Sequence, residues 1–312
     1  MIDPVDQIII ERLRNNCRAS LQELARVSGI SANAVIARIE NLVDSGTIER
    51  FLVLLSPQMS DEDTAIAILE FSTEQNEKNL LESLSRNPSV HRVSRLLDGR
   101  YIVYGIYFDQ EELNSLILHL NKLPGIKKIE MHFKFLHYWG GRIELTSAHR
   151  EVLRCLLDDP RMSVSNIARV TGFESNKIKE LIEHMRASEA VLFTITTSDD
   201  LDEKSTEVLA KVQWNVSQTS KEELLNWLQR EFGSLRLGEC VSAIEPVLFF
   251  HFSVKHVQEI EIVINKTKEF GLVTTIEPLI MFPGIKFSDP RQRRARVLLQ
   301  ETGFSSQGSP FA

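Results

Sequence analysis

The sequence predicts an α+β fold that is built as a tandem repeat, and three observations support this. Helical apolar stripes and strand-like runs alternate along the chain. A shift of 143 positions aligns residues 2–52 with 145–195 without a gap, and the same shift continues into the segment that follows. Self-similarity at a fixed period determines the architecture of a chain more strongly than any local pattern does. The 312 residues therefore divide into two copies of one unit and a tail of about 26 residues.

The composition excludes several classes of protein. The chain is 43% hydrophobic and 25% charged, with a net charge of -7, which is ordinary for a globular protein and too apolar for a disordered one. It has no run near the roughly 18 apolar residues of a membrane span, and its N-terminus does not resemble a secretory signal. The three cysteines show no metal or redox spacing. We expect a cytoplasmic protein with free thiols, no metal and no cofactor.

The first thirty residues predict two helices. Asp3 caps the first helix and Pro4 occupies its first position, which are the preferred residues at those places. Ser20 caps a short second helix, and Glu23 stands where a capping box requires it. Gly29 ends the second helix, because glycine adopts the left-handed conformation at little cost.

A third helix and a strand complete this segment. Ser31 caps the helix and Gly46 ends it, and the apolar run from Ile48 to Leu55 predicts one or two strands. Two short helices joined by a glycine-containing turn form a helix-turn-helix, to which the strands would add a wing. Residues 1–57 are therefore predicted to form a winged helix-turn-helix.

Such a unit suggests DNA binding. Its second helix lies in the major groove with its N-terminal residues near the base edges. Here small side chains allow close approach, Asn33 is suited to adenine, and Arg38 is suited to a phosphate or guanine. The residues predicted to contact DNA in this unit are Arg18, Ser20, Ser31, Ala32, Asn33, Ala34 and Arg38. The alternative is a three-helix packing unit that binds no nucleic acid.

A family resemblance supports the DNA-binding interpretation. The matching residues are Ile2-Asp3-Pro4-Val5-Asp6, Arg18 to Ala25, Gly29-Ile30-Ser31, Val35, Arg38-Ile39, Leu42 and Gly46-Thr47-Ile48. At these positions the segment resembles the winged helix-turn-helix of the Lrp/AsnC (feast/famine) transcription regulators, here in a tandem duplicated form. The resemblance implies double-stranded DNA as partner, a homo-oligomer (dimer or higher) and no enzymatic activity.

Residues 62–138 predict a ferredoxin-like βαββαβ domain. The Asp98-Gly99 pair is a strong hairpin signal between its second and third strands. The expected strands are 65–71, 90–97, 101–108 and 126–136, with helices around 80–84 and 113–120. In the family that the chain resembles, this domain mediates oligomerisation and often binds a small effector, commonly an amino acid.

The effector site differs from the family pattern. The family has Thr-Gly, a short spacer and Asp at the hairpin. This chain keeps Gly99 but has Asp98 in place of Thr and Ile102 in place of Asp. The resemblance therefore implies an effector site at Gly99, Arg100 and Tyr101, with amino-acid recognition weakened by the missing carboxylate.

The second copy repeats the pattern with changes. Residues 144–198 are predicted to be a degenerate winged helix-turn-helix and residues 205–283 a second ferredoxin-like domain, and 11 of the 51 aligned positions are identical. Glu189 replaces Gly46, and Leu181 replaces Arg38. Asn176, Lys177 and Lys179 are predicted DNA contacts, mainly to phosphates. The alternative is the solvated face of an amphipathic helix.

Duplication suggests an intramolecular pseudo-dimer. One chain can supply both helix-turn-helix units that a dimer presents to two half-sites, with its two sheets packed face to face. The tail, residues 284–312, carries a basic run that is either solvated or adds phosphate contacts.

Two other functions remain open. Sirohaem decarboxylases and related haem-pathway proteins resemble the same two-domain plan and some are two-copy fusions. Such an enzyme needs cations and histidines to hold tetrapyrrole carboxylates, and the only cluster of that kind is His91, Arg92, Arg95 and Arg100. A scaffold that assembles without binding DNA is the third interpretation.

Overall fold

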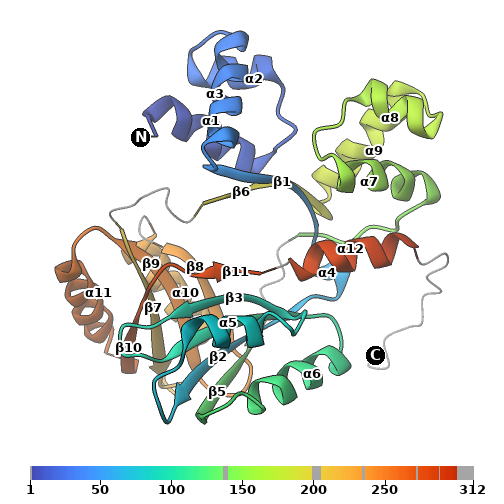
Figure 1. The fold of residues 1–312 in the computed structure, drawn as a ribbon. Helices are drawn as coiled ribbons and strands as arrows, with labels where there is room; N and C mark the ends of the chain where they lie inside the picture. Colours follow the sequence, from blue (N-terminus) through green and yellow to red (C-terminus); the bar gives the residue numbers. More distant parts are fainter. Residues whose placement is uncertain are drawn as a thin grey trace. The chain divides into compact units, whose positions relative to one another are not determined.

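The computed structural model describes residues 2–135, 140–198, 205–233, 236–271, 273–287 and 289–300. The chain divides into two compact units (Figure 1), and each unit combines segments of both repeat copies. The helical unit contains Met1–Glu62, Tyr138–Leu201 and Arg291–Ala312, and the sheet unit contains Asp63–His137 and Asp202–Pro290. Across the described ranges, no helix has the length and apolar character needed to cross a membrane.

The first copy forms the predicted helices in the helical unit. They are α1 (Pro4–Asn15), α2 (Leu21–Ser28) and α3 (Ala32–Asp44), followed by β1 (Ile48–Leu55) and the short α4 (Pro57–Ser60). Asp3, Ser20 and Ser31 cap the three helices as expected, and Gly29 adopts φ +71°. The capping box predicted at Ser20 forms only in part. The Glu23 carboxylate instead accepts a hydrogen bond from Arg12 Nε at 2.7 Å.

The second copy forms the equivalent elements α7 (Ser147–Asp158), α8 (Val164–Thr171), α9 (Ser175–Ala187) and β6 (Val191–Thr197). Gly172 ends α8 in the left-handed conformation, as Gly29 ends α2. The cap of α9 differs, because Glu174 replaces Ser31 and makes no side-chain capping bond. The start of α9 is therefore less well capped than the start of α3.

The predicted wing is formed by the two copies together. Each copy contributes one strand, and β1 pairs with β6 in an antiparallel two-stranded sheet, from Leu55 opposite Val191 to Ile48 opposite Thr197. The expectation that each copy would make its own wing is therefore wrong, because one strand satisfies its backbone groups on the strand of the other copy. Buried side chains of α1, α3 and α7 share one apolar core with this sheet.

Glu189 carries backbone strain that the repeat makes visible. Glu189 adopts a left-handed φ of +55°. Its counterpart in the first copy is a glycine, Gly46, which adopts a similar φ of +74°. The left-handed conformation costs a non-glycine residue roughly 1–2 kcal/mol. We therefore expect Glu189→Gly to raise the free energy of unfolding by up to about 1 kcal/mol, since added freedom of the unfolded chain offsets part of the gain. Urea unfolding measures this change in the free energy of unfolding. The control is Glu180→Gly at an exposed position in the middle of α9, which should destabilise the protein.

Part of the predicted tail is a docked helix, α12 (Pro290–Gln300), in the helical unit. Ala295, Leu298 and Leu299 are buried in the core that both copies share. Arg150 and Arg154 of α7 donate to the carbonyls of Leu298 and Leu299 at 2.9 and 2.5 Å, which satisfies groups at the helix end. The apolar residues at its C-terminal end, Leu298 and Leu299, explain why this segment packs against the core. The rest of the tail after Gln300 lies outside the described residues.

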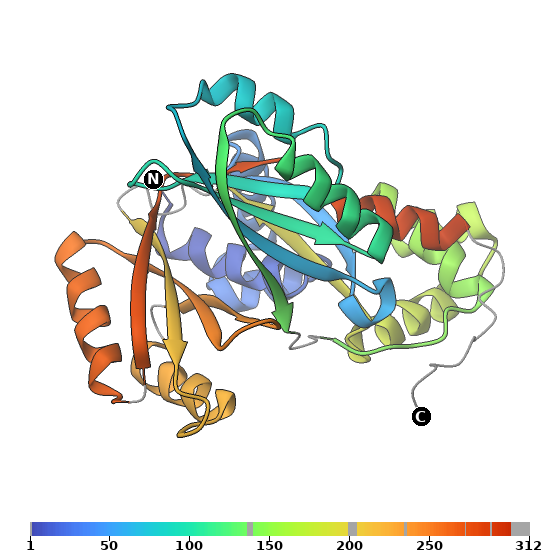
Figure 2. The same cartoon turned by 90° about the horizontal axis from the view of Figure 1, so that it is seen from below.

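The sheet unit contains both βαββαβ patterns. The first is β2 (Asp63–Phe71), α5 (Glu77–Leu84), β3 (Val90–Arg95), β4 (Tyr101–Tyr107), α6 (Gln110–Asn121) and β5 (Ile126–Phe135). The second is β7 (Thr206–Trp214), α10 (Lys221–Phe232), β8 (Arg236–Ser242), β9 (Val247–Val254), α11 (Val257–Glu269) and β10 (Val273–Met281), followed by β11 (Ile285–Lys286). In each copy the helices cover one face of the strands (Figures 1 and 2), with a separate apolar core beneath them.

The two sheets meet along edges and faces. The strand order is β10-β7-β9-β8-β5-β2-β4-β3-β11, so β5 of the first copy pairs with β8 of the second, and β11 pairs with β3. The faces away from the helices share a third apolar core, which we call the seam core. Its buried members are Ile66, Ile68, Leu96, Ile102, Leu209, Val247, Phe249, Leu279 and Met281.

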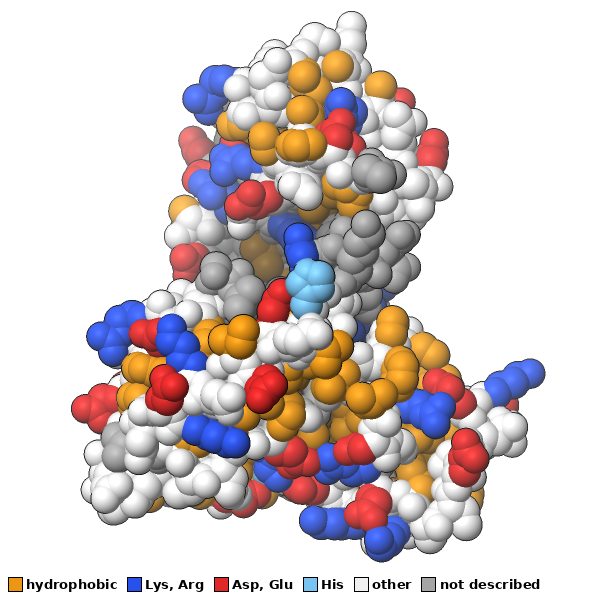
Figure 3. Space-filling model, turned by 90° about the vertical axis from the view of Figure 1, so that its left-hand side faces the viewer, with side chains coloured by type: hydrophobic (Ala, Val, Ile, Leu, Met, Phe, Trp, Pro, Cys, Tyr) orange, Lys and Arg blue, Asp and Glu red, His pale blue; other side chains and the backbone are white. Residues whose placement is uncertain are grey.

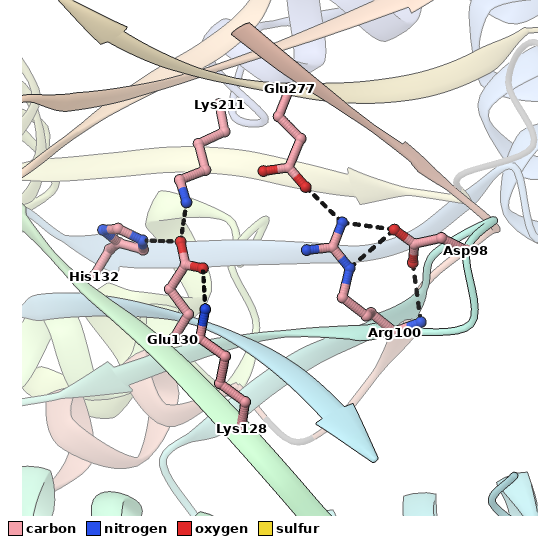
Figure 4. Close-up of polar contacts among 7 residues, drawn as sticks. All are labelled: Asp98, Arg100, Lys128, Glu130, His132, Lys211 and Glu277. Atoms are coloured by element: carbon pink, nitrogen blue, oxygen red, sulfur yellow. Dashed lines mark hydrogen bonds and ion pairs between the residues drawn. The ribbon is translucent and has the colours of Figure 1, made fainter. Parts of the chain in front are cut away.

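Charged clusters flank the seam core (Figure 4). Glu130 of the first copy pairs with Lys211 of the second and accepts a hydrogen bond from His132 at 2.8 Å. The bond from His132 and the charge of Lys211 lower the pKa of Glu130 to about 2. Arg100 joins Asp98 of its own copy to Glu277 of the other, with 2.6 Å to each carboxylate. These pairs cross between copies, as the hydrophobic contacts do.

Candidate nucleic-acid interface

The N-terminus of α3 has the form expected of a recognition helix. The Ser31 hydroxyl accepts a hydrogen bond from the amide of Ala34 at 3.2 Å. Asn33 is exposed, while Ala32 and Ala34 are half-buried. The first turn of a helix presents amide groups and a positive dipole end, which favour a phosphate. This turn thus offers a short polar side chain and a close approach of the backbone.

Arg38 does not extend from this surface as predicted. Its Nη1 donates to Asp3 Oδ2 and Asp6 Oδ1, both at 2.7 Å. The bonds to Asp6 and Asp3 raise the pKa of Arg38, and the Asp6 amide and Arg38 lower the pKa of Asp3. Two carboxylates neutralise the cation, so the arrangement braces α3 against the start of α1. The sequence contained all three residues, but spacing alone does not predict a contact between separate helices.

Arg18 is also placed differently from the prediction. Its guanidinium donates to the carbonyls of Pro160 and Met162 in the second copy, at 2.6 and 2.9 Å. Burial lowers the pKa of Arg18. Its counterpart Arg161 lies over the ring of Phe51 in the first copy, 5.3 Å from the centroid. Arg18 therefore holds the copies together, and Ser20 acts as the cap of α2.

The second helix-turn-helix exposes cations near the start of α9. Asn176, Lys177 and Lys179 are all exposed. Lys177 Nζ lies 4.5 Å from the ring centroid of Phe173, a cation–π contact that orients the ammonium group without neutralising it. This helix therefore offers two cations to phosphates, whereas α3 has only Arg38, which is paired.

Neither helix-turn-helix is strongly basic. Residues 1–57 contain seven acidic and six basic side chains, and residues 144–198 contain eight and seven. On the face drawn in Figure 3, Lys and Arg side chains alternate with Asp and Glu. Binding by bulk charge alone is therefore disfavoured, and any DNA complex must depend on a few placed contacts.

The predicted effector residues line one cleft of the sheet unit, with a volume of about 420 Å³. Gly99 forms the hairpin with φ +87°, which explains why glycine stands there. Tyr101 is buried and packs edge-on against Phe71, with ring centroids 5.9 Å apart. Arg100 is paired with Asp98 and Glu277, so a ligand would have to compete with two carboxylates for it.

The cationic cluster considered for a tetrapyrrole is partly neutralised. Arg92 Nη2 lies 3.0 Å from Glu207 of the second copy, and Arg100 is paired as described. Within the described ranges there is no group of three or more His, Cys, Asp or Glu side chains placed to hold a metal ion. Sequence reasoning also missed the contact of His149 with His184, because it joins two helices through residues 35 positions apart.

Comparisons with known proteins agree with this architecture. The model of the AsnC-type helix-turn-helix domain matches residues 2–43. The HTH-type transcriptional regulator FL11 of Pyrococcus horikoshii is 24% identical over 127 residues, 40% of this chain and 84% of that protein. The transcriptional regulator AzlB of Bacillus subtilis is 27% identical over 135 residues, 42% of this chain and 86% of that protein.

Solved structures of one enzyme resemble nearly the whole chain. One of them is the sirohaem decarboxylase NirDL in complex with an iron-uroporphyrin III analogue, with a TM-score of 0.57, 13% identity, and coverage of 95% of this chain and 99% of that chain. At this identity the likeness shows the fold alone. The shared fold therefore extends over both copies.

Proposed function

The chain carries an AsnC-type helix-turn-helix domain and is related to the Lrp/AsnC transcription regulators, and from this premise we propose that it is a sequence-specific DNA-binding regulator. In this proposal one chain acts as a pseudo-dimer. The observation that carries it is the helical unit, where two helix-turn-helix units share one core and one β1–β6 sheet while the starts of α3 and α9 stay exposed.

The two recognition helices have different tasks in this proposal. Asn33 and the first turn of α3 read bases, because they combine a short polar side chain with close backbone approach. Lys177 and Lys179 on α9 contact phosphates, which positions the protein with little sequence reading. The cleft at Gly99 and Tyr101 is the candidate effector site. As the family resemblance implies, we expect the chain to assemble further as a homo-oligomer.

DNA binding is tested by fluorescence anisotropy with fragments selected from a random duplex library, across a salt series. A specific complex should weaken linearly in log Kd against log salt, with a slope of about 0.9 for each phosphate contacted. Lack of selection for any sequence, or no binding at low salt, would refute the proposal.

Replacing both lysines of α9 tests the phosphate contacts. We expect Lys177→Ala with Lys179→Ala to reduce the salt slope by about two and to leave the ranking of selected sequences unchanged. Asn33→Ala should change that ranking and keep the slope. A matched control is Lys266→Ala in the sheet unit, where the lysine pairs with Glu231, and both slope and ranking should stay as in the original chain.

A second candidate is a tetrapyrrole enzyme of the sirohaem decarboxylase type. The observation that favours it is the fold shared with NirDL over almost the full length of both chains. Against it, Glu207, Asp98 and Glu277 neutralise Arg92 and Arg100. Titration with iron-uroporphyrin III distinguishes the candidates: a saturable shift of its absorption band would support the enzyme, and no shift at micromolar protein would exclude this ligand.

A further inference from the structure

The two recognition helices are braced to their first helices by different chemistry. In the first copy, Arg38 of α3 binds Asp3 and Asp6 of α1. The shift of 143 positions replaces these three residues by Leu181, Thr146 and His149, so no equivalent ion pair can form. In their place His149 of α7 contacts His184 of α9.

One arrangement of hydrogens satisfies every contact of this histidine pair. His149 Nδ1 lies 3.3 Å from the Thr146 amide, which can only donate, and 2.8 Å from the Thr146 hydroxyl, which can donate or accept, so both contacts are hydrogen bonds when Nδ1 accepts. The hydrogen of His149 therefore lies on Nε2 and is donated to His184 Nδ1, 3.1 Å away. His184 then carries its own hydrogen on Nε2. Both rings are neutral in this arrangement.

Protons added to the pair disturb this arrangement. One proton is kept only if the hydrogen of His149 moves to Nδ1, where the Thr146 hydroxyl accepts it and the Thr146 amide loses its acceptor. With both rings protonated, two N–H groups and two positive charges face each other across the 3.1 Å contact. His149 is 6% exposed, so a charge there would also be poorly solvated. Burial, and then the neighbouring His184, lower the pKa of His149.

Neighbouring charges do not compensate. On α7, Arg150 donates to the Leu298 carbonyl, and on α9, Glu183 and Arg186 pair with each other. The α8 helix contributes Arg169, a further cation, and β6 has no ionisable side chain. Within the part of the chain that the structure describes, neither imidazole forms an ion pair with a carboxylate, so no carboxylate neutralises the charge of a protonated pair.

We propose that His149 and His184 form a proton-sensitive brace that positions α9, so that the second helix-turn-helix loosens below about pH 6 while the first stays fixed. The folded state favours neutral His149. The stabilisation from this residue is therefore complete above the ordinary histidine pKa of about 6.5 and is lost as the pH falls below that value. In the first copy, the Asp6 amide and Arg38 lower the pKa of Asp3, so this brace keeps its charge over the same range.

Hydrogen exchange of the full chain tests the brace without DNA. Rates are measured at pH 7.5 and 5.5 and corrected for intrinsic exchange. We expect the protection of α9 amides to fall about tenfold more than that of α3 amides, because each pH unit of a titrating group is worth a factor of ten. In His184→Gln, which keeps a neutral polar group, the fall in α9 protection should be smaller, because only the burial of His149 then opposes its protonation.

The control is His119→Gln in the sheet unit, where burial also lowers the pKa of the histidine. It should leave the α9 response unchanged. Equal loss of protection in α3 and α9, or a full α9 response in His184→Gln, would overturn the brace. Its effect on DNA affinity rests on the proposed function, so absence of DNA binding would refute that function and leave the exchange result to decide the brace.

Discussion

Phe249→Ala is expected to lower the free energy of unfolding of the sheet unit by about 3–5 kcal/mol. The side chain is fully buried in the seam core, and its ring lies 4.8 Å from that of His132. Strands held in register on both sides limit collapse into the resulting cavity, which keeps the cost high. Urea unfolding measures the loss, and Leu118→Ala, at a side chain 59% exposed, should change stability by less than about 0.5 kcal/mol.

The same variant tests whether the two sheets depend on each other. Phe249 belongs to β9 of the second copy, while the seam core includes Ile66, Ile68 and Ile102 of the first. We therefore expect faster hydrogen exchange in β2 and β4 as well as in β7 and β9. Faster exchange confined to the second copy would mean that the sheets fold independently, which would contradict the pseudo-dimer.

Glu62→Ala is expected to lower the free energy of unfolding by about 2 kcal/mol, between the values for exposed and buried pairs, and to release α12. Glu62 is 4% exposed, and Nε and Nη2 of Arg291 donate to its two oxygens at 2.8 Å each. Removing Glu62 leaves the charge of Arg291, whose side chain is 25% exposed, without its buried partner. Limited trypsin digestion should then cleave near Arg293 and Arg294 faster than in the original chain.

An exposed ion pair between α12 and α7 supplies the control. Arg296 Nη1 lies 3.0 Å from Asp158 Oδ1, and the two side chains are 55% and 70% exposed. Exposed pairs contribute little, so Asp158→Asn should change stability by less than about 1 kcal/mol and leave the cleavage rate unchanged. Similar effects of both variants would mean that Glu62 does not hold α12 in place.

Much of the fold was predictable because its signals are local. Capping residues such as Asp3, Ser20 and Ser31 lie next to the helices that they begin, and Asp98-Gly99 lies within its own hairpin. The repeat of 143 positions predicted where the elements of the second copy lie in the sequence. In the structure β2 and β7 begin 143 positions apart. These patterns involve neighbours in sequence or a comparison of the chain with itself.

The parts that sequence analysis missed are contacts between distant segments. The pairing of β1 with β6 depends on which edges are unpaired after both copies fold. Arg38 and Arg18 were assigned to DNA because cations near a helix-turn-helix favour phosphates, but carboxylates and carbonyls of the chain itself bind them. A single sequence contains the partners of these arginines without indicating which of them meet.

Hydroxyl-radical footprinting on a selected duplex tests the central claim, that one chain presents two helix-turn-helix units to DNA. At a protein-to-DNA ratio of one, we predict two protected segments on one side of the duplex, about one helical turn apart. The segment under α9 should fade in the Lys177→Ala with Lys179→Ala variant, and the segment under α3 should remain. A single protected segment in the original chain, or protection that needs two chains for each pair of segments, would contradict the account.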